Sequence, residues 1–342
     1  MKILVTGATG FIGSRLCHVL VEQGHDVIVF HRRESSLEGL DGLPLKMIAG
    51  DITDDPSLSP AFDEKPEVVF HLAARHVHSR NNDRLIETNA GGTRRIIQEA
   101  FRVGVSRIVL MSSALTIGYA DAVTNDNDIT AAIDENHNWL NPPSYWQFAW
   151  SKLYAEREAQ WAGLFGMDIV ICNPFWVVGP NDTYRLWSNL VSQFIQHPPK
   201  SIINGGVNLV AVDDAVRGLI HAMEYGERGK RYLLCGKNLS FSHLFGMLSE
   251  ITGKPAPQLS LPGSLSNRIV NYRLRFRNLF PNAELFDDPI FFSGKYFYYN
   301  DNESRLALHL PPPSDIRETL QKTYEWVING YEKQINLSAA QN

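Results

Sequence analysis

The chain begins with Lys2-Ile-Leu-Val-Thr6 and continues directly into Gly7-Ala-Thr-Gly10-Phe-Ile-Gly13. The apolar run before the glycines predicts a buried strand, and the residues from Ser14 to Gln23 predict a helix after them. A strand joined to a helix by spaced glycines is an arrangement in which the backbone can bind phosphate groups. This stretch therefore predicts the first strand, turn and helix of a dinucleotide-binding sheet.

The three glycines have separate expected roles. Gly7 permits a tight turn, Gly10 lets the backbone approach a pyrophosphate, and Gly13 lets the helix pack closely on the strand. The phosphates would accept hydrogen bonds from the free amides at the helix start, at Phe11 and Ile12. The alternative, a strand, turn and helix that bind nothing, is disfavoured because the glycines stand between a strand and a helix.

Short apolar runs alternate with stretches of helical periodicity through the first half of the chain. Continuous apolar strands separated by helices predict a parallel sheet that is covered on both faces. We therefore expect an α/β fold, a Rossmann-type doubly wound parallel sheet with a smaller C-terminal substrate lobe. The predicted strands are Ile3–Val5, Val27–Phe30, Leu45–Ile48, Val68–His71, Arg107–Met111 and Ile169–Cys172. The predicted helices of this half are Ser14–Gln23, Ala90–Arg102 and Tyr145–Leu164.

The second half predicts a looser mixture of elements. Residues 1–180 are expected to form the dinucleotide-binding domain, and a segment from about 205 to 235 would return to it. Residues 181–330 would form most of the substrate-binding lobe. A last helix is expected over Ser314–Asn329, with residues 331–342 as a flexible tail.

Composition describes an ordinary globular chain of 342 residues, with 44% hydrophobic and 20% charged residues. The net charge of -5 argues against nucleic-acid binding. Cys17, Cys172 and Cys235 have no metal or redox spacing, so we expect reduced thiols, no metal site and a cytoplasmic location. No apolar run approaches the length of a membrane span, so no membrane partner is expected.

Phe148 and Lys152 have the spacing of a Tyr-x-x-x-Lys dyad in which the hydroxyl is missing. Residues at i and i+4 lie on one face of a helix, where an ammonium lowers the pKa of a neighbouring phenol. Such a phenol can pass a proton during hydride transfer, which phenylalanine cannot do. Ser144 and Gln147 form a capping box that starts this helix at Tyr145, a substitute donor about two turns from Lys152.

Further motifs recur along most of the chain. They are Gly50-Asp51-Ile52, His71-Leu-Ala-Ala74, Asn89-Ala-Gly-Gly-Thr93, Ser112-Ser113, Asn173-Pro174, Gly179-Pro180, Val210-Ala-Val-Asp213-Asp214 and Gly294-Lys-Tyr-Phe. With the glycine loop and the 148–152 pair, they resemble the extended short-chain dehydrogenase/reductase family, of the NAD-dependent epimerase/dehydratase type. The branch is similar to dihydroflavonol-reductase-like proteins. The resemblance implies a nicotinamide cofactor, a small-molecule substrate and a homodimer.

The same resemblance assigns cofactor contacts. Asp51 and Ile52 would contact the adenine, and Asn89 would brace the neighbouring strand or a structural water. The other expected contacts are Leu72, Ala73 and Ala74, which would line the central channel, and Pro174 and Val177, which would hold the nicotinamide amide through backbone groups.

The end of the second strand bears on the choice between NAD and NADP. It reads Phe30-His-Arg32-Arg33, without an acidic residue to bind the adenosine ribose hydroxyls. Arg32 is expected to pair with a 2′-phosphate instead, so NADP(H) is favoured and NAD(H) is the alternative. A solvated basic turn is the other interpretation of Arg32.

In the reaction centre, Ser113 corresponds to the family's hydroxyl that binds the substrate carbonyl, with Ser112 as the neighbouring candidate. By the same resemblance, Lys152 would donate to the nicotinamide ribose. Three explanations of Phe148 stay open: an introduced, inactivating Tyr-to-Phe change; a natural phenylalanine with another donor or solvent; or dinucleotide binding without turnover. The other candidate donors are Tyr145, Tyr119, His76 and His78.

The favoured function is an NADP(H)-dependent oxidoreductase that transfers hydride to or from a ketone or alcohol of a hydrophobic or aromatic small molecule. Aromatic residues crowd the region expected to border the nicotinamide, and flat apolar substrates gain from stacking on such side chains. They are Trp139, Tyr145, Trp146, Phe148, Trp150, Trp176, Tyr184 and Trp187. One alternative is a nucleotide-sugar epimerase or dehydratase that retains NAD and binds a diphosphate with Arg273, Arg275 and Arg277. The other is a non-catalytic dinucleotide-binding protein.

Overall fold

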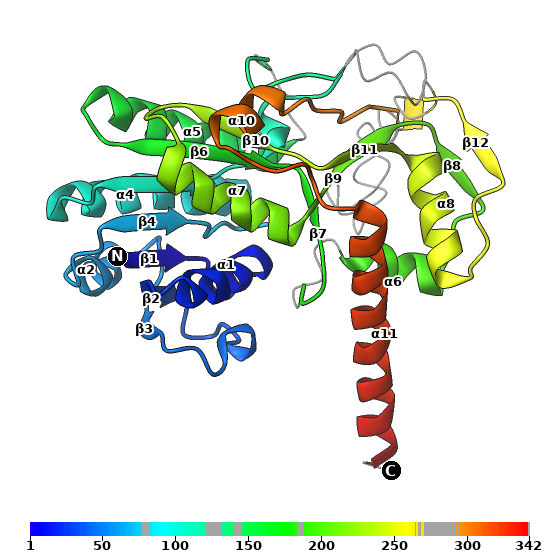
Figure 1. Ribbon diagram of the computed structural model, residues 1–342, viewed down its shortest axis with the longest axis horizontal. Coiled ribbons are helices and arrows are strands. Elements are labelled where there is room, and N and C mark those ends of the chain that lie inside the picture. Colours follow the sequence, from blue (N-terminus) through cyan, green and yellow to red (C-terminus); the bar gives the residue numbers. More distant parts are fainter. Residues whose placement is uncertain are drawn as a thin grey trace.

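A parallel sheet of seven strands forms the centre of the larger lobe (Figure 1). The computed structural model describes residues 1–76, 82–120, 132–137, 139, 146–182, 188–263, 265, 268–269, 292 and 294–340. The strand order is β10-β6-β5-β4-β1-β2-β3, and all neighbouring pairs are parallel. The strands are β1 (Lys2–Thr6), β2 (Asp26–His31), β3 (Lys46–Ala49), β4 (Val68–His71), β5 (Arg107–Met111), β6 (Ile169–Pro174) and β10 (Arg231–Leu234). The predicted fold class and the predicted strands are confirmed.

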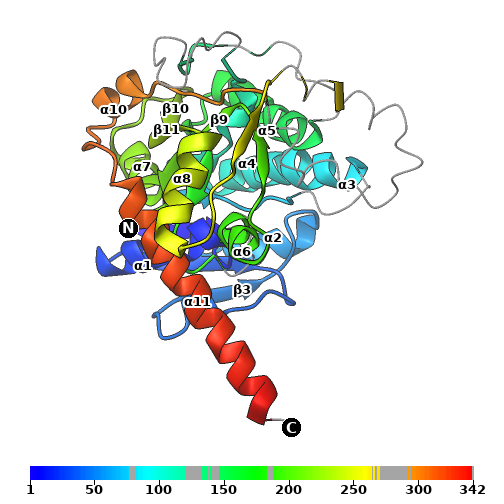
Figure 2. The ribbon, with the colours of Figure 1, turned by 90° about the vertical axis from the view of Figure 1, so that its right-hand side faces the viewer.

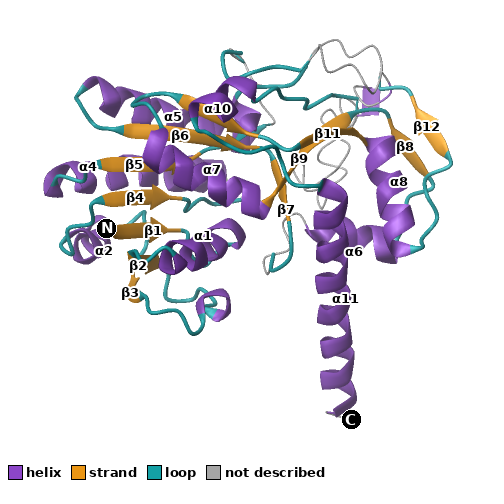
Figure 3. Cartoon of the chain, in the orientation of Figure 1, coloured by secondary structure: helices purple, strands orange, loops and turns teal. Residues whose placement is uncertain are grey.

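Helices cover both faces of this sheet, as the continuous apolar strands require (Figure 3). Ile3 and Val5 face one core together with helices α1 (Phe11–Glu22) and α7 (Val212–Tyr225). Leu4, between them, faces the other core. That second core is closed by α2 (Asp55–Phe62), α4 (Gly92–Val103) and α5 (Gln147–Leu164).

The direction of sheet growth reverses between β1 and β4. From β1 the chain adds β2 and β3 on one side, and it then adds β4, β5, β6 and β10 on the other. The register pairs Thr6 at the end of β1 with His71 at the end of β4, so the loops that follow both strands emerge side by side. In open α/β sheets, ligands bind at this reversal, outside the carboxyl ends of the strands.

The smaller lobe contains a three-stranded sheet and a two-stranded sheet, with helices packed beside them (Figure 1). Its elements are β7 (Trp176–Val178), α6 (Ser188–Gln196), β8 (Ser201–Ile203), β9 (Gly206–Ala211), β11 (Lys237–Ser240), α8 (Phe241–Thr252) and β12 (Leu259–Leu261). The segment from 205 to 235 is divided between the lobes: β9 belongs to the small sheet, whereas α7 and β10 pack on or join the large one.

Helix α11 (Ile316–Ala340) begins beside the smaller lobe and projects away from the rest of the molecule (Figure 2). The predicted helix ended at Asn329, but the backbone stays helical to Ala340. The backbone of the expected flexible tail, residues 331–342, is thus helical as far as Ala340. Residues 331–340 contain no proline or glycine, so only Gly330 opposes helix formation, by about 1 kcal/mol. Among the described helices, none is both long and apolar enough to cross a bilayer.

Candidate active site

The glycine loop follows β1 and packs against the backbone of the loop after β4. Gly7 has a φ of +75°, and a Cβ atom there would lie 2.5 Å from the amide nitrogen of Ala73. A Cβ atom on Gly13 would lie 2.1 Å from the carbonyl oxygen of Gly7. Both approaches are too close for any side chain, so these two positions require glycine.

Gly10 differs from Gly7 and Gly13 because the space around it is open. A Cβ atom there would meet only the Gly7 carbonyl oxygen within 4 Å, at 3.2 Å. Helix α1 begins directly after Gly10, which has no side chain that could cap the amides of the first turn. Open backbone and uncapped amides are what the pyrophosphate of a dinucleotide requires, so the loop fits that group.

The residues predicted near the adenosine end occupy the turns after β2 and β3. Arg32 follows β2, its side chain is 56% exposed, and its Nε lies 3.5 Å from Glu34 Oε1. The Asp51 carboxylate accepts hydrogen bonds from the backbone amide and hydroxyl of Thr53, at 2.8 and 2.7 Å. Ile52 is buried beside α4. The Arg32 guanidinium is therefore accessible, whereas the Asp51 side chain already shapes its own turn.

Asn89 joins the loop after β4 to helix α5. It lies in a π-helical turn (Glu87–Gly91) between α3 (Asn82–Ile86) and α4, and it is almost fully buried. Its Oδ1 accepts from the Arg75 amide at 2.7 Å, and its Nδ2 donates to the Arg75 carbonyl at 3.1 Å and to Ser151 Oγ at 2.8 Å. Asn89 thus fixes the loop that carries Leu72, Ala73 and Ala74.

His71 belongs to a buried chain of hydrogen bonds that defines its tautomer. The Thr93 hydroxyl donates to the Asn89 carbonyl at 2.6 Å, so it must accept from His71 Nε2 at 3.0 Å. His71 Nδ1 then accepts from the Thr6 hydroxyl at 2.7 Å. Burial, with the nearby Lys152 charge, lowers the pKa of His71 to about 3. The imidazole is therefore neutral, and we read its role as structural.

Lys152 lies on α5 at the carboxyl end of β5. Its ammonium donates to the Met111 carbonyl at 2.8 Å, and the side chain is buried. Burial lowers the pKa of Lys152 to about 8, against the opposing effect of Glu156. The amine is thus mostly protonated at pH 7, and it is a positive charge held at the edge where the parallel strands end.

Ser113 and Ser112 follow β5 and have different partners. Ser113 Oγ accepts from the Leu115 amide at 3.3 Å, which caps the short helical turn Ala114–Thr116. Ser112 Oγ donates to Glu156 Oε1 inside the core. Because the Ser112 hydroxyl is engaged by a carboxylate, Ser113 is the better placed of the two to bind a substrate.

Glu156 organises this loop, a role that the sequence analysis missed. Its Oε1 also lies 2.7 Å from Asn173 Nδ2 and 2.7 Å from the Thr116 hydroxyl. Asn173 and Thr116 in turn lie 3.1 and 2.8 Å from the Ser113 carbonyl. One buried carboxylate therefore holds the loop that carries Ser113. The available signal was its position four residues after Lys152, on the same helix face.

Phe148 lies in the first turn of α5, and its ring stacks on the imidazole of His76. The ring centroids are 4.4 Å apart and the planes meet at 28°. Tyr145, the predicted substitute donor, lies outside the described residues, as do Ser144 of the capping box and His78. Among the described candidates for the donor, His76 contacts Phe148, whereas Tyr119 packs against Trp139 and Phe297.

An aromatic cluster extends from the start of α5 into the smaller lobe. Trp146 packs edge-on against Trp139, with centroids 5.0 Å apart, and stacks on Phe297 at 5.4 Å. Trp146 and Phe297 are buried, whereas Tyr119, Trp139, Trp176 and Phe292 are partly exposed at the edge of the cluster. Pro174 and Val177, expected beside the nicotinamide, are buried at the end of β6 and in β7.

Only some of the aromatic residues predicted to border the nicotinamide belong to this cluster. Trp150 lies outside the cluster and packs against Tyr154, at 5.8 Å. Tyr184, Trp187 and the three arginines at 273, 275 and 277 lie outside the described residues.

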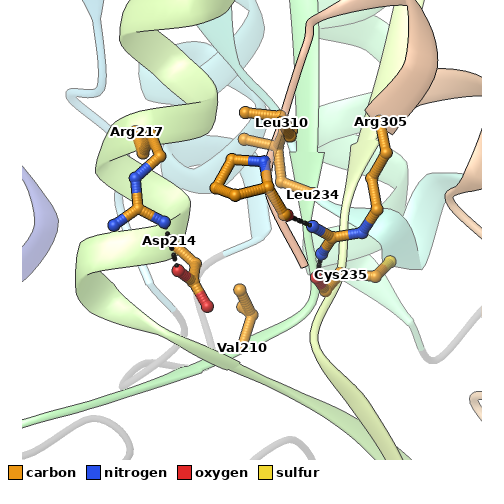
Figure 4. Close-up of a pocket in the computed structure, with 8 residues that line it drawn as sticks. Val210, Asp214, Arg217, Leu234, Cys235, Arg305 and Leu310 are labelled. Atoms are coloured by element: carbon orange, nitrogen blue, oxygen red, sulfur yellow. Dashed lines mark hydrogen bonds and ion pairs between the residues drawn. The ribbon is translucent and has the colours of Figure 1, made fainter. Parts of the chain in front are cut away.

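A small crevice between α7 and β10 lies elsewhere and has a structural role (Figure 4). Arg217 pairs with Asp214 at 2.8 Å, and Arg305 donates to the carbonyl oxygens of Pro311 and Cys235. Asp214 also accepts from the Ser314 amide and hydroxyl, which ties α7 to the residues just before α11. None of the residues predicted for the active site lines this crevice.

Comparison with known proteins identifies the family. The profile of the NAD dependent epimerase/dehydratase family matches residues 3–235. The chain is 34% identical over 275 residues to sterol demethylase protein B of Methylococcus capsulatus, covering 79% of this chain and 80% of that protein. It is 30% identical over 340 residues to a putative dihydroflavonol 4-reductase of Synechocystis sp., covering 96% and 95%.

Solved structures show the same fold. The crystal structure of gox2253 superimposes with a TM-score of 0.82 at 26% identity and covers 96% of this chain and 98% of that one. The UDP-glucose 4-epimerase of Thermotoga maritima superimposes with a TM-score of 0.76 at 22% identity, covering 97% and 100%. Together with the profile match and the motifs at the strand ends, these similarities show that the chain belongs to the NAD-dependent epimerase/dehydratase family, the extended type of short-chain dehydrogenase/reductase.

Proposed function

We propose that the protein is an NADP(H)-dependent oxidoreductase that interconverts a ketone and an alcohol on a flat, hydrophobic small molecule. The observation that carries the proposal is that three features follow the carboxyl ends of strands of the large sheet. These are the glycine cradle, the buried ammonium of Lys152 and the aromatic cluster around Trp146. The cofactor would supply or accept the hydride.

Each group of residues has one task in this proposal. The amides at Phe11 and Ile12 bind the pyrophosphate beside Gly10, and the Lys152 ammonium binds the nicotinamide ribose. The Ser113 hydroxyl donates to the substrate oxygen. The partly exposed aromatic side chains exclude water and bind the apolar body of the substrate.

The names of the relatives support a hydrophobic substrate. They include sterol demethylase protein B, sterol-4-alpha-carboxylate 3-dehydrogenase, anthocyanidin reductase and cinnamoyl-CoA reductase 1. These names share molecules that contain an apolar ring system. A nucleotide-sugar epimerase is the second candidate, favoured by relatives such as the UDP-glucose 4-epimerase of Streptomyces lividans. The absence of an acidic residue in the stretch Phe30–Arg33 weighs against the tight NAD binding of that candidate.

The direct test is NADPH oxidation with a ketone panel of acetophenone, cyclohexanone, flavanone and a 3-ketosteroid. The protein and its Phe148→Tyr variant are assayed side by side, because either may hold the competent proton donor. We expect NADPH oxidation by at least one form with one or more of the ring ketones. Epimerisation consumes no NADPH, so it is tested separately, by chromatographic detection of an epimer formed from UDP-glucose. NADPH binding by both forms without reduction of any ketone would contradict the reductase proposal.

Arg32 should decide the preference for NADP(H). Arg32→Ala is expected to weaken NADPH binding roughly 10- to 100-fold, because a hydrogen-bonded charge pair to phosphate contributes about 1.5–3 kcal/mol. NADH binding should stay within about twofold. Arg33→Ala, at the next position, is the matched control and should affect NADPH much less. The NADPH and NADH affinities are measured by quenching of tryptophan fluorescence. If Arg32→Ala and Arg33→Ala weakened NADPH binding equally, the preference for NADPH would come from the positive charge of the turn as a whole and not from a specific bond to Arg32.

A further inference from the structure

The contact between His76 and Phe148 places an imidazole, which has an exchangeable N–H proton, against a phenyl ring, which has no exchangeable proton. The centroids lie 4.4 Å apart and the planes meet at 28°, so the imidazole covers the face of the phenyl ring. Both side chains are partly exposed, so the pair borders accessible space. Phe148 is four residues before Lys152 on α5, the position at which a dyad would carry its phenol.

The backbone just before His76 is held in place by side-chain hydrogen bonds. The adjacent residue, Arg75, is held at both its amide and its carbonyl by the buried side chain of Asn89. Asn89 also donates to Ser151 Oγ, and Ser151 Oγ donates to the Phe148 carbonyl at 2.8 Å. The backbone beside His76 is therefore linked through two side chains to the turn of α5 that carries Phe148. Such support restricts how far the two rings can move apart.

The other candidate polar side chains near the carboxyl end of β5, namely Lys152, Ser112 and Tyr119, are engaged by partners other than Phe148. The Lys152 ammonium donates to the Met111 carbonyl at 2.8 Å, and Ser112 is bound to Glu156. The Tyr119 ring is packed between Trp139 and Phe297, with Lys295 Nζ 5.9 Å from its centroid. In the described part of the chain, the imidazole of His76 stacks directly on the Phe148 ring. Imidazole is also the side chain that most readily exchanges a proton near neutral pH.

We propose that His76 is the proton donor of this enzyme and replaces the phenol that position 148 lacks, an inference that rests on the proposed reductase function. During reduction, the carbonyl carbon gains the hydride that the cofactor supplies, and the electron pair of the C=O π bond moves to the oxygen. A protonated His76 gives one ring N–H proton to that oxygen, which forms the alcohol. The imidazole is left neutral and regains its proton from solvent. In the direction of alcohol oxidation, the same ring accepts the proton.

Four proteins test this role: the parent chain, His76→Phe, Phe148→Tyr and the double variant. His76→Phe keeps a ring for stacking and removes both nitrogens. We expect kcat for ketone reduction to fall about 10²–10⁴-fold in His76→Phe, with NADPH affinity within about twofold of the parent. The double variant should recover most of the loss, because its tyrosine hydroxyl stands where the dyad spacing requires a donor.

A second readout does not depend on turnover. Diethylpyrocarbonate should acylate His76 in the cofactor-free protein, and bound NADP⁺ should slow that reaction, because the proposed role puts the ring beside the reacting end of the cofactor. Peptide mass spectrometry gives the rate at His76, and the exposed His197 after α6 serves as an internal reference. An unchanged rate at His76 when NADP⁺ binds would contradict the proposal.

The outcomes separate this inference from the proposed function. Full activity of His76→Phe, or activity of Phe148→Tyr with an inactive parent, would overturn the role of His76 and leave the reductase function standing. A failure of all four proteins to oxidise NADPH, with binding intact, would overturn both. Loss in His76→Phe with recovery in the double variant supports both.

Discussion

Gly7→Ala is expected to destabilise the protein by about 2–5 kcal/mol and to abolish dinucleotide binding. A left-handed backbone costs a non-glycine residue about 1–2 kcal/mol, and overpacking adds about 1–3 kcal/mol. Both apply here, because φ is +75° and the new Cβ atom would lie 2.5 Å from a backbone nitrogen of the loop after β4. The measurements are the free energy of unfolding in urea and the NADPH affinity.

Gly24→Ala provides the matched control for that experiment. Gly24 has a φ of +78°, but a Cβ atom there would meet nothing within 4 Å. It should therefore show the conformational cost alone, about 1–2 kcal/mol, with normal NADPH binding. If the two variants lost equal stability and both bound NADPH, the close packing between the glycine loop and the β4 loop would have no energetic role.

The second large effect is expected for Glu156→Ala, at about 3–5 kcal/mol of stability. The carboxylate is buried, and its removal takes away the acceptor of the Ser112 hydroxyl. It also takes away one of the acceptors of Thr116 and Asn173, which keep the Ser113 carbonyl. It also removes the charge that faces Arg231 Nη1 at 3.6 Å. Breaking one partner of a buried charged network typically costs about this much. Because the same network holds the Ser113 loop, kcat should fall with stability.

Glu158→Ala, two residues further along α5, is the control. Glu158 Oε1 lies 3.8 Å from Arg94 Nη1, and both side chains are partly exposed. Surface pairs of this kind contribute about 0–1 kcal/mol. The comparison is made by urea unfolding and by KM and kcat with the best ketone of the panel. A loss below 1 kcal/mol in Glu156→Ala would show that its neighbours find other partners.

The sequence predicts the large sheet well because its signals there are local. Apolar runs such as Val68–His71 and Arg107–Met111 are long enough to identify strands, and the glycine loop identifies the start of α1. The short strands β7, β8 and β12 have three residues each and carry too little pattern for prediction. Their positions depend on the core of the smaller lobe, which is built from residues distant in sequence.

The active site also has features that local sequence predicts and features that depend on contacts between distant segments. The dyad register and the glycine positions follow from spacing, which is visible in one segment at a time. The roles of Glu156 and His76 depend on contacts between α5 and loops that follow β5 and β4. No periodicity reports such contacts. The sequence ranks Ser113 above Ser112 by resemblance alone, and the bond from Ser112 to Glu156 adds a physical reason for that order.

Transfer of deuterium from NADPH labelled at C4 of the nicotinamide tests the central claim most directly. The label is placed on either face of the ring in separate reactions with the best ketone of the panel, and the product is analysed by mass spectrometry. We predict deuterium on the carbinol carbon from one of the two labelled cofactors and none from the other. An alcohol product without deuterium from either cofactor, or tight binding with no product at all, would contradict a hydride-transferring oxidoreductase.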